Sequence, residues 1–189
     1  TGGEWSEAGA TFFLQKGINI IDIDTSSADV AVDCLSVKHA DNYDDMVTVI
    51  EAESDQVIRS GDVSEAENEY ASEGAYIAGI RGSGDGSNSI EFTYNAPEAG
   101  NYKMIVYQSN KELFGSHSYN AQMVDRYITI QVNGGDPFNV VFRNTYSDES
   151  FKTQIVDLNL NEGENTIKIY NDDTRELKNG VGGVNTCIN

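Results

Sequence analysis

The sequence has little proline, little cysteine and few basic residues. Proline occurs twice and cysteine twice among 189 residues, and Lys and Arg together number 12 against 31 Asp and Glu. The resulting net charge of −19 disfavours nucleic acids and anionic membranes as partners, because both bind basic surfaces. The same acidity suits cations and neutral ligands, and it is also a common means of keeping a protein soluble.

Long apolar runs are missing as well. No stretch of 18 or more apolar residues exists, so the sequence predicts no membrane-spanning helix. No leader pattern is visible, and we expect the opening Thr1-Gly2-Gly3 to be the start of a cut fragment. Cys34 and Cys187 either form one disulfide between distant parts of the chain or remain buried thiols. Their spacing is not that of a structural zinc site.

Strand-forming residues are abundant. There are 10 Tyr, 7 Phe and 18 Gly, and Val, Ile and Thr recur throughout. Most patterned segments alternate apolar and polar residues with a period of two, and Gly-containing turn signals such as Asn133-Gly134 and Glu162-Gly163 separate them. The predicted strands are 11–14, 18–23, 30–37, 46–51, 89–94, 100–108, 126–132, 138–143, 151–160 and 165–170. Many short strands without a long helical period predict an all-β fold, a β-sandwich or jelly roll, with one short helical turn at 62–71.

A segment near the start of the chain is repeated near its end. Residues 14–23 match residues 160–169 at a Leu, a Gly, an Asn and two Ile positions. A further strand, within 30–38, follows the first copy only. We therefore interpret residues 1–45 as the closing strands of a preceding or strand-exchanged sandwich unit, and residues 46–189 as a second unit without its own last strand. Because an unpaired edge is unfavourable, we expect the strand within 30–38 to fill the gap, inside the chain or by exchange between chains. The alternative is that the first unit packs separately.

The motifs between residues 47 and 172 follow a specific order. They are Val49-Ile50-Glu51-Ala52-Glu53, Gly74-Ala75-Tyr76-Ile77, Ala99-Gly100-Asn101-Tyr102, Gln131-Val132-Asn133-Gly134, Val141-Phe142-Arg143-Asn144-Thr145 and Gly163-Glu164-Asn165-Thr166-Ile167. Their order and spacing together resemble the carbohydrate-binding modules of families 6 and 35, which are appended to bacterial glycoside hydrolases. Residues 28–37 also resemble the last strand of these modules.

The resemblance implies a galactose-binding-like β-sandwich with structural calcium, whose loops or sheet face hold a sugar. The expected function is non-catalytic carbohydrate binding that targets a linked glycoside hydrolase to its polysaccharide or glycan, in a secreted bacterial protein. The alternative is a structural or adhesion module that spaces domains or joins chains. We expect an oligosaccharide or polysaccharide ligand and a linked catalytic domain as partners, with a strand-exchanged dimer as a further option and with no nucleic acid or membrane. Neither Cys34 nor Cys187 has a recognisable base context and no G-x-S-x-G motif occurs, so no enzyme activity is expected.

Glu51 and Glu53 are the predicted metal ligands. They are two residues apart, so on a strand both carboxylates point to one face and repel each other unless a cation lies between them. Calcium, which takes six to eight oxygen ligands, suits such a pair. The resemblance adds Asp33 from the last strand as a third ligand. The alternative is that both Glu side chains are merely solvated.

The predicted ligand-binding residues lie in loops that join strands. A sugar needs an aromatic ring for its C–H face, and amides, carboxylates or Arg for its hydroxyl groups. The long segment 107–127 offers both kinds, and the ends of the strands near residues 143 and 171 are expected to reach the same rim. Arg126 and Arg143 are alternatively structural partners of acids, and Tyr76 is alternatively a core residue. The predicted set is Tyr76, Tyr107, Asn110, His117, Tyr119, Asn120, Arg126, Arg143, Asn144, Tyr146 and Asn171.

Overall fold

The chain divides into two units, Thr1–Val49 and Ile50–Asn189. Its computed structural model describes residues 6, 8–12, 14, 19–23, 32–38, 47–82, 84–114, 122–172 and 186–188. The described residues of the first unit form no strand, and apolar side chains such as Ile20 and Leu35 are exposed there. The strands predicted at 11–14, 18–23 and 30–37 are therefore not formed by the described residues of those segments. None of the described helical segments has the length and apolar character needed to cross a lipid bilayer.

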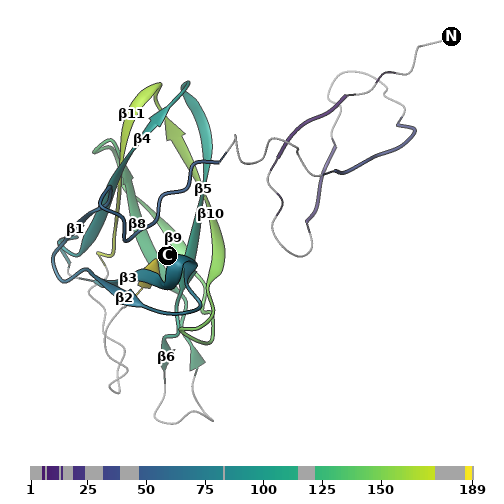
Figure 1. Ribbon diagram of the computed structural model, residues 1–189. Helices are drawn as coiled ribbons and strands as arrows, with labels where there is room; N and C mark the ends of the chain where they lie inside the picture. Colours follow the sequence, from purple (N-terminus) through teal and green to yellow (C-terminus); the bar gives the residue numbers. More distant parts are fainter. Residues whose placement is uncertain are drawn as a thin grey trace. The chain divides into compact units, whose positions relative to one another are not determined.

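The second unit is a sandwich of two antiparallel five-stranded sheets (Figure 1). Sheet A has the order β1-β4-β11-β8-β9, sheet B has the order β10-β5-β12-β3-β2, and β6 and β7 form a separate two-stranded hairpin. The predicted all-β sandwich is thus confirmed. The elements are β1 Ile58–Ser60, β2 Ser64–Glu67, the 3-10 turn η1 Ser72–Gly74, β3 Ala75–Ile80, β4 Ser89–Ala96, β5 Gly100–Ser109, β6 Leu113–Phe114, β7 Gln122–Met123, β8 Arg126–Val132, β9 Phe138–Phe142, β10 Lys152–Leu160, β11 Gly163–Tyr170 and β12 Thr186–Ile188.

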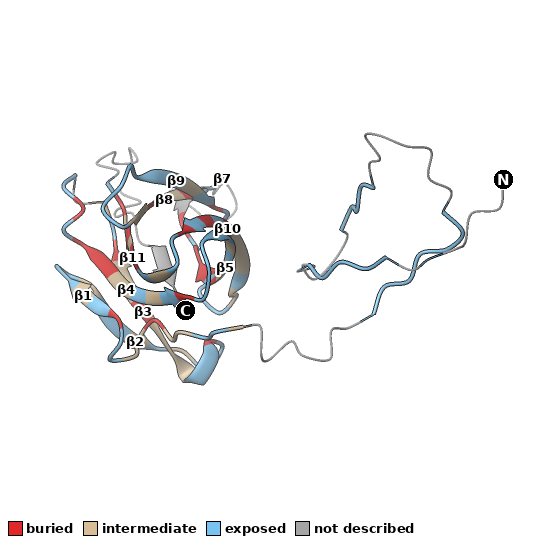
Figure 2. Ribbon diagram, turned by 90° about the horizontal axis from the view of Figure 1, so that it is seen from above, coloured by how far each residue is buried: buried red, intermediate tan, exposed pale blue. Residues whose placement is uncertain are grey.

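The core lies between the two sheets and is built by alternate residues of their strands (Figure 2). Sheet A contributes side chains such as Ile128, Ile130 and Ile167, and sheet B contributes Ile77 and Ile80. All of these are almost completely buried. Because β-branched residues fit a pleated half-buried surface, the period-two pattern predicted from the sequence corresponds to this inner face.

The repeated residues near the end of the chain build the hairpin from β10 to β11. Gly163 has a φ of 88°, which glycine adopts without steric cost. Asn165 is fully buried, and its side-chain amide donates to the carbonyl oxygens of Asn161 and Gly163 at 2.8 and 2.9 Å. Ile167 and Ile169 face the core. The matching Gly, Asn and Ile residues at 14–23 therefore carry the sequence signature of this same turn and strand.

Two expectations about secondary structure are wrong. The Glu- and Ala-rich segment 62–71 contains the edge strand β2 instead of a helical turn, because pairing with β3 outweighs its intrinsic helix propensity. Residues 47–51, part of the predicted strand 46–51, are not in a strand. Strands β1 and β3 were not predicted at all.

The expectation that residues 46–189 lack a last strand of their own meets strand β12, which lies between β3 and β5 near the end of the chain. Thr186 pairs with Ile80, and Ile188 pairs with both Ile77 and Gln108. The described residues 32–38 are not in a strand, so they do not supply this strand within the chain. Exchange between chains and the predicted boundary at residue 45 stay predictions.

Candidate functional site

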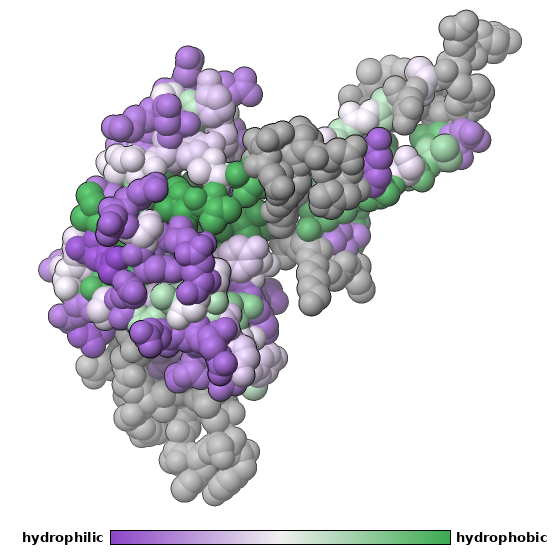
Figure 3. Space-filling view, viewed as in Figure 1, coloured by the Kyte–Doolittle hydropathy of each residue, from purple (hydrophilic) through white to green (hydrophobic). Residues whose placement is uncertain are grey.

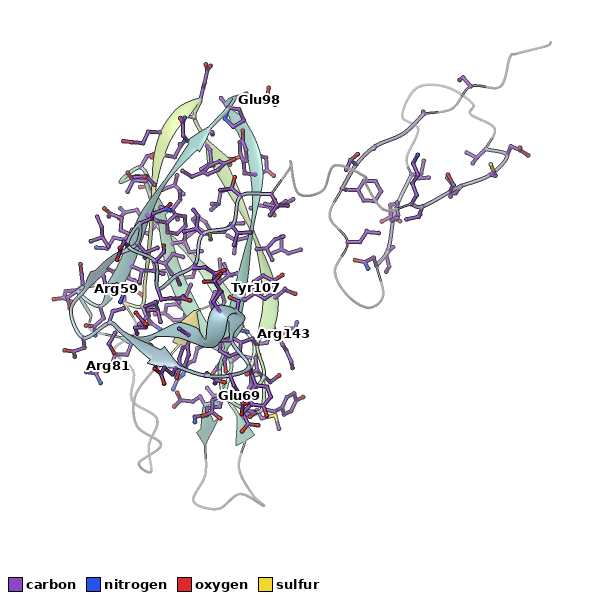
Figure 4. The ribbon with its side chains drawn as sticks, in the orientation of Figure 1. Arg59, Glu69, Arg81, Glu98, Tyr107 and Arg143 are labelled. Carbon is purple, nitrogen blue, oxygen red and sulfur yellow. The ribbon has the colours of Figure 1, made fainter. Side chains whose placement is uncertain are left out.

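Segments from four parts of the chain meet at one end of the sandwich. We call this region, formed by residues 68–74, 107–112, 124–126 and 143–152, the loop end. The side-chain amide of Asn68 donates to the carbonyl oxygen of Asp148 at 2.9 Å, and the Ser109 hydroxyl donates to that of Ser147 at 3.1 Å. Figure 4 shows Glu69, Tyr107 and Arg143 toward this end near η1, with Glu98 at the opposite end. The Val124 backbone N–H donates to the carbonyl oxygen of Glu112 at 3.1 Å, so hydrogen bonds join all four segments.

Three aromatic residues occupy the outer face of sheet B at the loop end. The rings of Tyr76 and Phe151 meet edge to face, with centroids 5.8 Å apart and planes at 65°. Tyr107 is 51% exposed and lies opposite Thr153, so by strand alternation it shares a face with Phe151. Diagonal neighbours on one face of a sheet are within reach of aromatic side chains. We call Tyr76, Tyr107 and Phe151 the aromatic face.

A fourth aromatic residue projects from the loop between β9 and β10. Tyr146 is 65% exposed, and the Lys152 ammonium lies 4.8 Å from its ring centroid. Lys152 follows Phe151 directly, so strand alternation directs its side chain to the face of sheet B opposite the aromatic face, and the cation–aromatic pair is a separate feature of the loop end. Tyr70, in the loop before η1, is also exposed. The loop end therefore presents several rings, which is what stacking against sugars requires.

Three of the predicted ligand-binding amides are buried and bonded to the protein itself. The Asn110 amide donates to the carbonyl oxygens of Val124 and Phe142 at 2.9 and 3.2 Å. The Asn171 amide donates to that of Tyr127 at 3.0 Å, and Asn144 is likewise buried. In this structure these side chains hold loops together. Their predicted contact with a ligand stays a prediction.

The two predicted arginines differ in their surroundings. Arg126 is buried and its guanidinium lies 2.9 Å from the Glu112 carboxylate, which is the structural alternative considered for it. Arg143 is exposed, and its carbonyl oxygen accepts a hydrogen bond from the Gln108 amide at 3.2 Å. Another pair, Lys111 with Asp148, is exposed at the loop end, and the Lys111 ammonium lowers the pKa of the Asp148 carboxyl. The remaining predicted residues His117, Tyr119 and Asn120 lie outside the described residues.

The predicted metal ligands Glu51 and Glu53 belong to an acidic cluster next to η1. Glu51 accepts a hydrogen bond of 2.8 Å from the Ser72 hydroxyl. Both carboxylate oxygens of Glu53 are inaccessible to solvent and have no hydrogen-bond partner among the described residues. Burial raises the pKa of the Glu53 carboxyl, and the neighbouring charges of Glu51, Glu65 and Glu73 raise it further. Such a carboxylate fits a cation, because a positive charge relieves both its repulsion and its missing contacts.

The oxygens around Glu51 and Glu53 decide whether a calcium ion can be bound there. In the described part of the chain, no three His, Cys, Asp or Glu side chains form a metal-binding group. An ion held by Glu51 and Glu53 therefore needs further oxygens from the backbone, hydroxyls, water or Asp33. Asp33 belongs to the first unit, so its predicted place beside the pair stays a prediction. On the second unit, the face shown in Figure 3 is largely hydrophilic, with a patch of apolar residues.

Sequence reasoning missed three residues at this end. Phe151 was included in a predicted strand but not recognised as the ring that meets Tyr76. Glu112 and Ser72 were not singled out, although they bind Arg126 and Glu51. The alternation of 151, 153 and 155 opposite Tyr107 is the signal that points to Phe151, once the pairing of β5 with β10 is known.

Comparison with known proteins identifies the fold and its relatives. No protein-family model matches the chain. A solved family 35 carbohydrate-binding module from Clostridium thermocellum is 31% identical, with a TM-score of 0.59, and the match covers 75% of this chain and 98% of that module. Among curated proteins, a 3-O-alpha-D-galactosyl-alpha-L-arabinofuranosidase from Bifidobacterium longum subsp. longum is 28% identical over 182 residues, covering 82% of this chain. A 3-O-beta-L-arabinopyranosyl-alpha-L-arabinofuranosidase from Bifidobacterium pseudocatenulatum is 26% identical over 170 residues, covering 73% of this chain.

The chain covers a small share of the two enzymes but almost all of the solved module. The chain spans only 16% and 17% of the two curated enzymes, but nearly the whole of the family 35 module. The sandwich described above is therefore comparable in extent to a complete module. With this identity and coverage, the chain belongs to family 35 of the carbohydrate-binding modules.

Proposed function

We propose that this module binds glycans containing galactose or arabinose on the aromatic face of the loop end. The names of the two curated relatives refer to galactosyl, arabinopyranosyl and arabinofuranosyl groups, which supports sugars of this class. The observation that carries the site is the edge-to-face pair of Tyr76 and Phe151 beside the exposed ring of Tyr107. Apolar C–H faces of a pyranose or furanose pack on such rings, and nearby loop groups bind the hydroxyls.

An uncharged sugar is compatible with the strongly negative net charge of the protein. The net charge of −19 repels polyanions at a distance, whereas a neutral sugar is not affected by this field. At the loop end Lys111 and Arg126 are paired with Asp148 and Glu112, and Lys152 lies over the Tyr146 ring. For a neutral sugar we expect binding to depend on stacking and hydrogen bonds more than on long-range attraction.

We also propose that Glu51 and Glu53 hold a structural calcium ion. The unpartnered, buried oxygens of Glu53 and its raised pKa support this assignment. A bound ion supplies positive charge between the two carboxylates and stabilises the native state by linkage. Since Ser72 binds Glu51 and lies only four residues before Tyr76, a fixed Glu51 also steadies the start of β3.

The module is proposed to serve a linked glycoside hydrolase in a secreted bacterial protein. Both curated relatives are glycosidases of which a chain of this length forms a small part. A linked module raises the effective concentration of a catalytic domain at its polymer without making new catalytic contacts. For this targeting role the sandwich has only to bind the glycan, and it needs no catalytic residues of its own.

The proposal is tested by isothermal titration of the protein with defined sugars. Galactose, arabinose, β-1,3-galactan oligosaccharides and arabinogalactan form the test set, with xylo- and manno-oligosaccharides as controls. Each titration is run with calcium and with EDTA. Saturable binding confined to the test set supports the proposal, and binding of the controls alone contradicts the sugar class. Absence of binding to every sugar, with a folded protein, contradicts the function itself and favours a structural or adhesion role.

A further inference from the structure

Tyr146 has an unusual backbone conformation for a bulky exposed residue. Its φ is 72°, in the left-handed region that normally favours glycine. The side chain is 65% exposed and is not part of the buried core. A left-handed tyrosine costs free energy that no core packing offsets here. Strain of this kind persists where the surrounding structure fixes it, and it is concentrated at functional sites.

Asn144 fixes this conformation directly. Its side-chain oxygen accepts a hydrogen bond from the backbone N–H of Tyr146 at 2.8 Å. Its side-chain amide donates to the carbonyl oxygen of Glu112 at 2.6 Å, and its backbone N–H donates to the Asp125 carboxylate at 2.8 Å. Asn144 is 7% exposed. It therefore uses both ends of its amide within the protein, one end for Tyr146 and the other for the segment around Glu112.

Thr145, which lies between Asn144 and Tyr146, is also held in place by hydrogen bonds. Thr145 is almost completely buried, and its backbone N–H donates to the carbonyl oxygen of Asn110 at 2.7 Å. The Thr145 hydroxyl contacts the carbonyl oxygen of Ser147 at 3.0 Å. The strained position thus follows two buried residues whose backbone has little freedom.

A buried ion pair lies beneath this arrangement. The Glu112 and Arg126 side chains are 5% and 7% exposed, and the atoms that face each other are 2.9 Å apart. A buried pair adds little net stability because both charges must lose their water, so its best-supported role is to fix geometry. Here it fixes the residue whose carbonyl oxygen binds Asn144.

We infer that Tyr146 is a stacking platform for the glycan, and that Asn144, supported by the Glu112–Arg126 pair, is a positioning residue that holds its ring without touching the ligand. The inference rests on the proposed function. It adds a second aromatic subsite at the loop end, separate from the aromatic face, where the Lys152 ammonium lies 4.8 Å from the Tyr146 ring centroid.

The test compares Tyr146→Gly, Tyr146→Phe and Asn144→Ala by titration with an arabinogalactan-derived oligosaccharide, and by thermal melting. Tyr146→Gly removes the ring and the strain together, so we expect an unchanged or higher melting temperature and about tenfold weaker binding. Tyr146→Phe keeps the ring and should bind as the native protein does. Asn144→Ala should weaken binding in the native background but cause no further loss in the Tyr146→Gly background, a coupling that a general loss of stability does not produce.

The outcomes separate this inference from the proposed function. If Tyr146→Gly binds as tightly as the native protein while Tyr76→Ala does not bind, the platform is disproved and the aromatic face stands. If Asn144→Ala weakens binding equally in both backgrounds, its positioning role is disproved. If the native protein binds no glycan, the proposed function fails and the inference fails with it.

Discussion

The ring of Tyr76 meets the ring of Phe151 edge to face, 5.8 Å between centroids, although the two residues lie 75 positions apart in the chain. Tyr76 is on β3, and Phe151 lies just before β10, at the far edge of the same sheet. Strands β5 and β12 lie between β10 and β3 in this sheet. The contact between the two rings therefore depends on the strand order of sheet B.

Phe151→Leu is expected to weaken glycan binding about tenfold while changing stability little. The substitution removes the aromatic ring but keeps an apolar side chain of similar volume, so the stacking contribution is lost and most of the packing is retained. Titration calorimetry measures the affinity, and thermal melting measures the stability.

The chain offers a matched control for this substitution. Tyr94 and Tyr102 form an edge-to-face pair with nearly the same geometry, 5.8 Å and 68°, away from the loop end. Tyr102→Leu should alter stability and leave affinity unchanged. Equal loss of affinity in both variants would show that the effect of Phe151 is general to the fold.

Glu53→Gln is expected to have opposite effects with and without calcium. In EDTA the substitution removes a buried carboxylate repelled by Glu51, Glu65 and Glu73, so the variant should melt at a higher temperature than the native protein. With calcium, the native protein should gain about 2.7 kcal/mol at a free concentration one hundred times Kd, and the variant little. Glu98→Gln, at the opposite end, is the control. A calcium-independent melting temperature of the native protein contradicts the metal assignment.

The same carboxyl gives a pH dependence in EDTA. The pKa of Glu53 is raised above its ordinary value of 4.5, so the native state holds this proton more tightly than the unfolded chain does. The stabilising effect of the proton is complete below about pH 4.5 and is lost as pH rises through the higher native pKa. Urea unfolding of the native protein and of Glu53→Gln, repeated across this pH range, measures the effect. The variant's advantage in free energy of unfolding over the native protein should grow with pH. An advantage that stays constant contradicts a raised pKa.

The sequence predicted the central strands well because their patterns are local. Strand β8 was predicted with its observed bounds, and β4, β5, β9, β10 and β11 within a few residues. Each has alternating β-branched or aromatic residues between turn signals. The edge strand β2 was misread because Ser64, Glu65, Ala66 and Glu67 have no apolar alternation and form a strand only by pairing with β3. Pairing with another strand leaves no signal within the segment itself.

The candidate site was only partly predictable for a related reason. The residue types of Tyr107 and Tyr146 suggested sugar binding, and the structure shows both exposed at the loop end. Asn110 and Asn171 looked equally suitable, yet they are buried and satisfy backbone carbonyl groups. An asparagine in a loop has the same appearance in the sequence whether it faces a ligand or holds the loop. Only the surrounding backbone distinguishes the two.

The Glu112–Arg126 pair predicts strongly non-additive effects on stability. Arg126→Met leaves the Glu112 carboxylate buried and unpaired, so we expect the free energy of unfolding to fall by about 3–5 kcal/mol. The double variant Glu112→Leu with Arg126→Met replaces both charges by apolar groups of similar size, and should unfold at nearly the native urea concentration or above it.

Urea unfolding followed by fluorescence measures all three proteins, and glycan titration of the double variant adds the decisive comparison. The backbone carbonyl of Glu112 remains available to Asn144 in the double variant. If the ion pair serves geometry more than stability, this variant folds fully but binds glycan more weakly than the native protein, because the Glu112 segment is held less firmly. A double variant as unstable as Arg126→Met shows instead that the charges themselves are needed for folding.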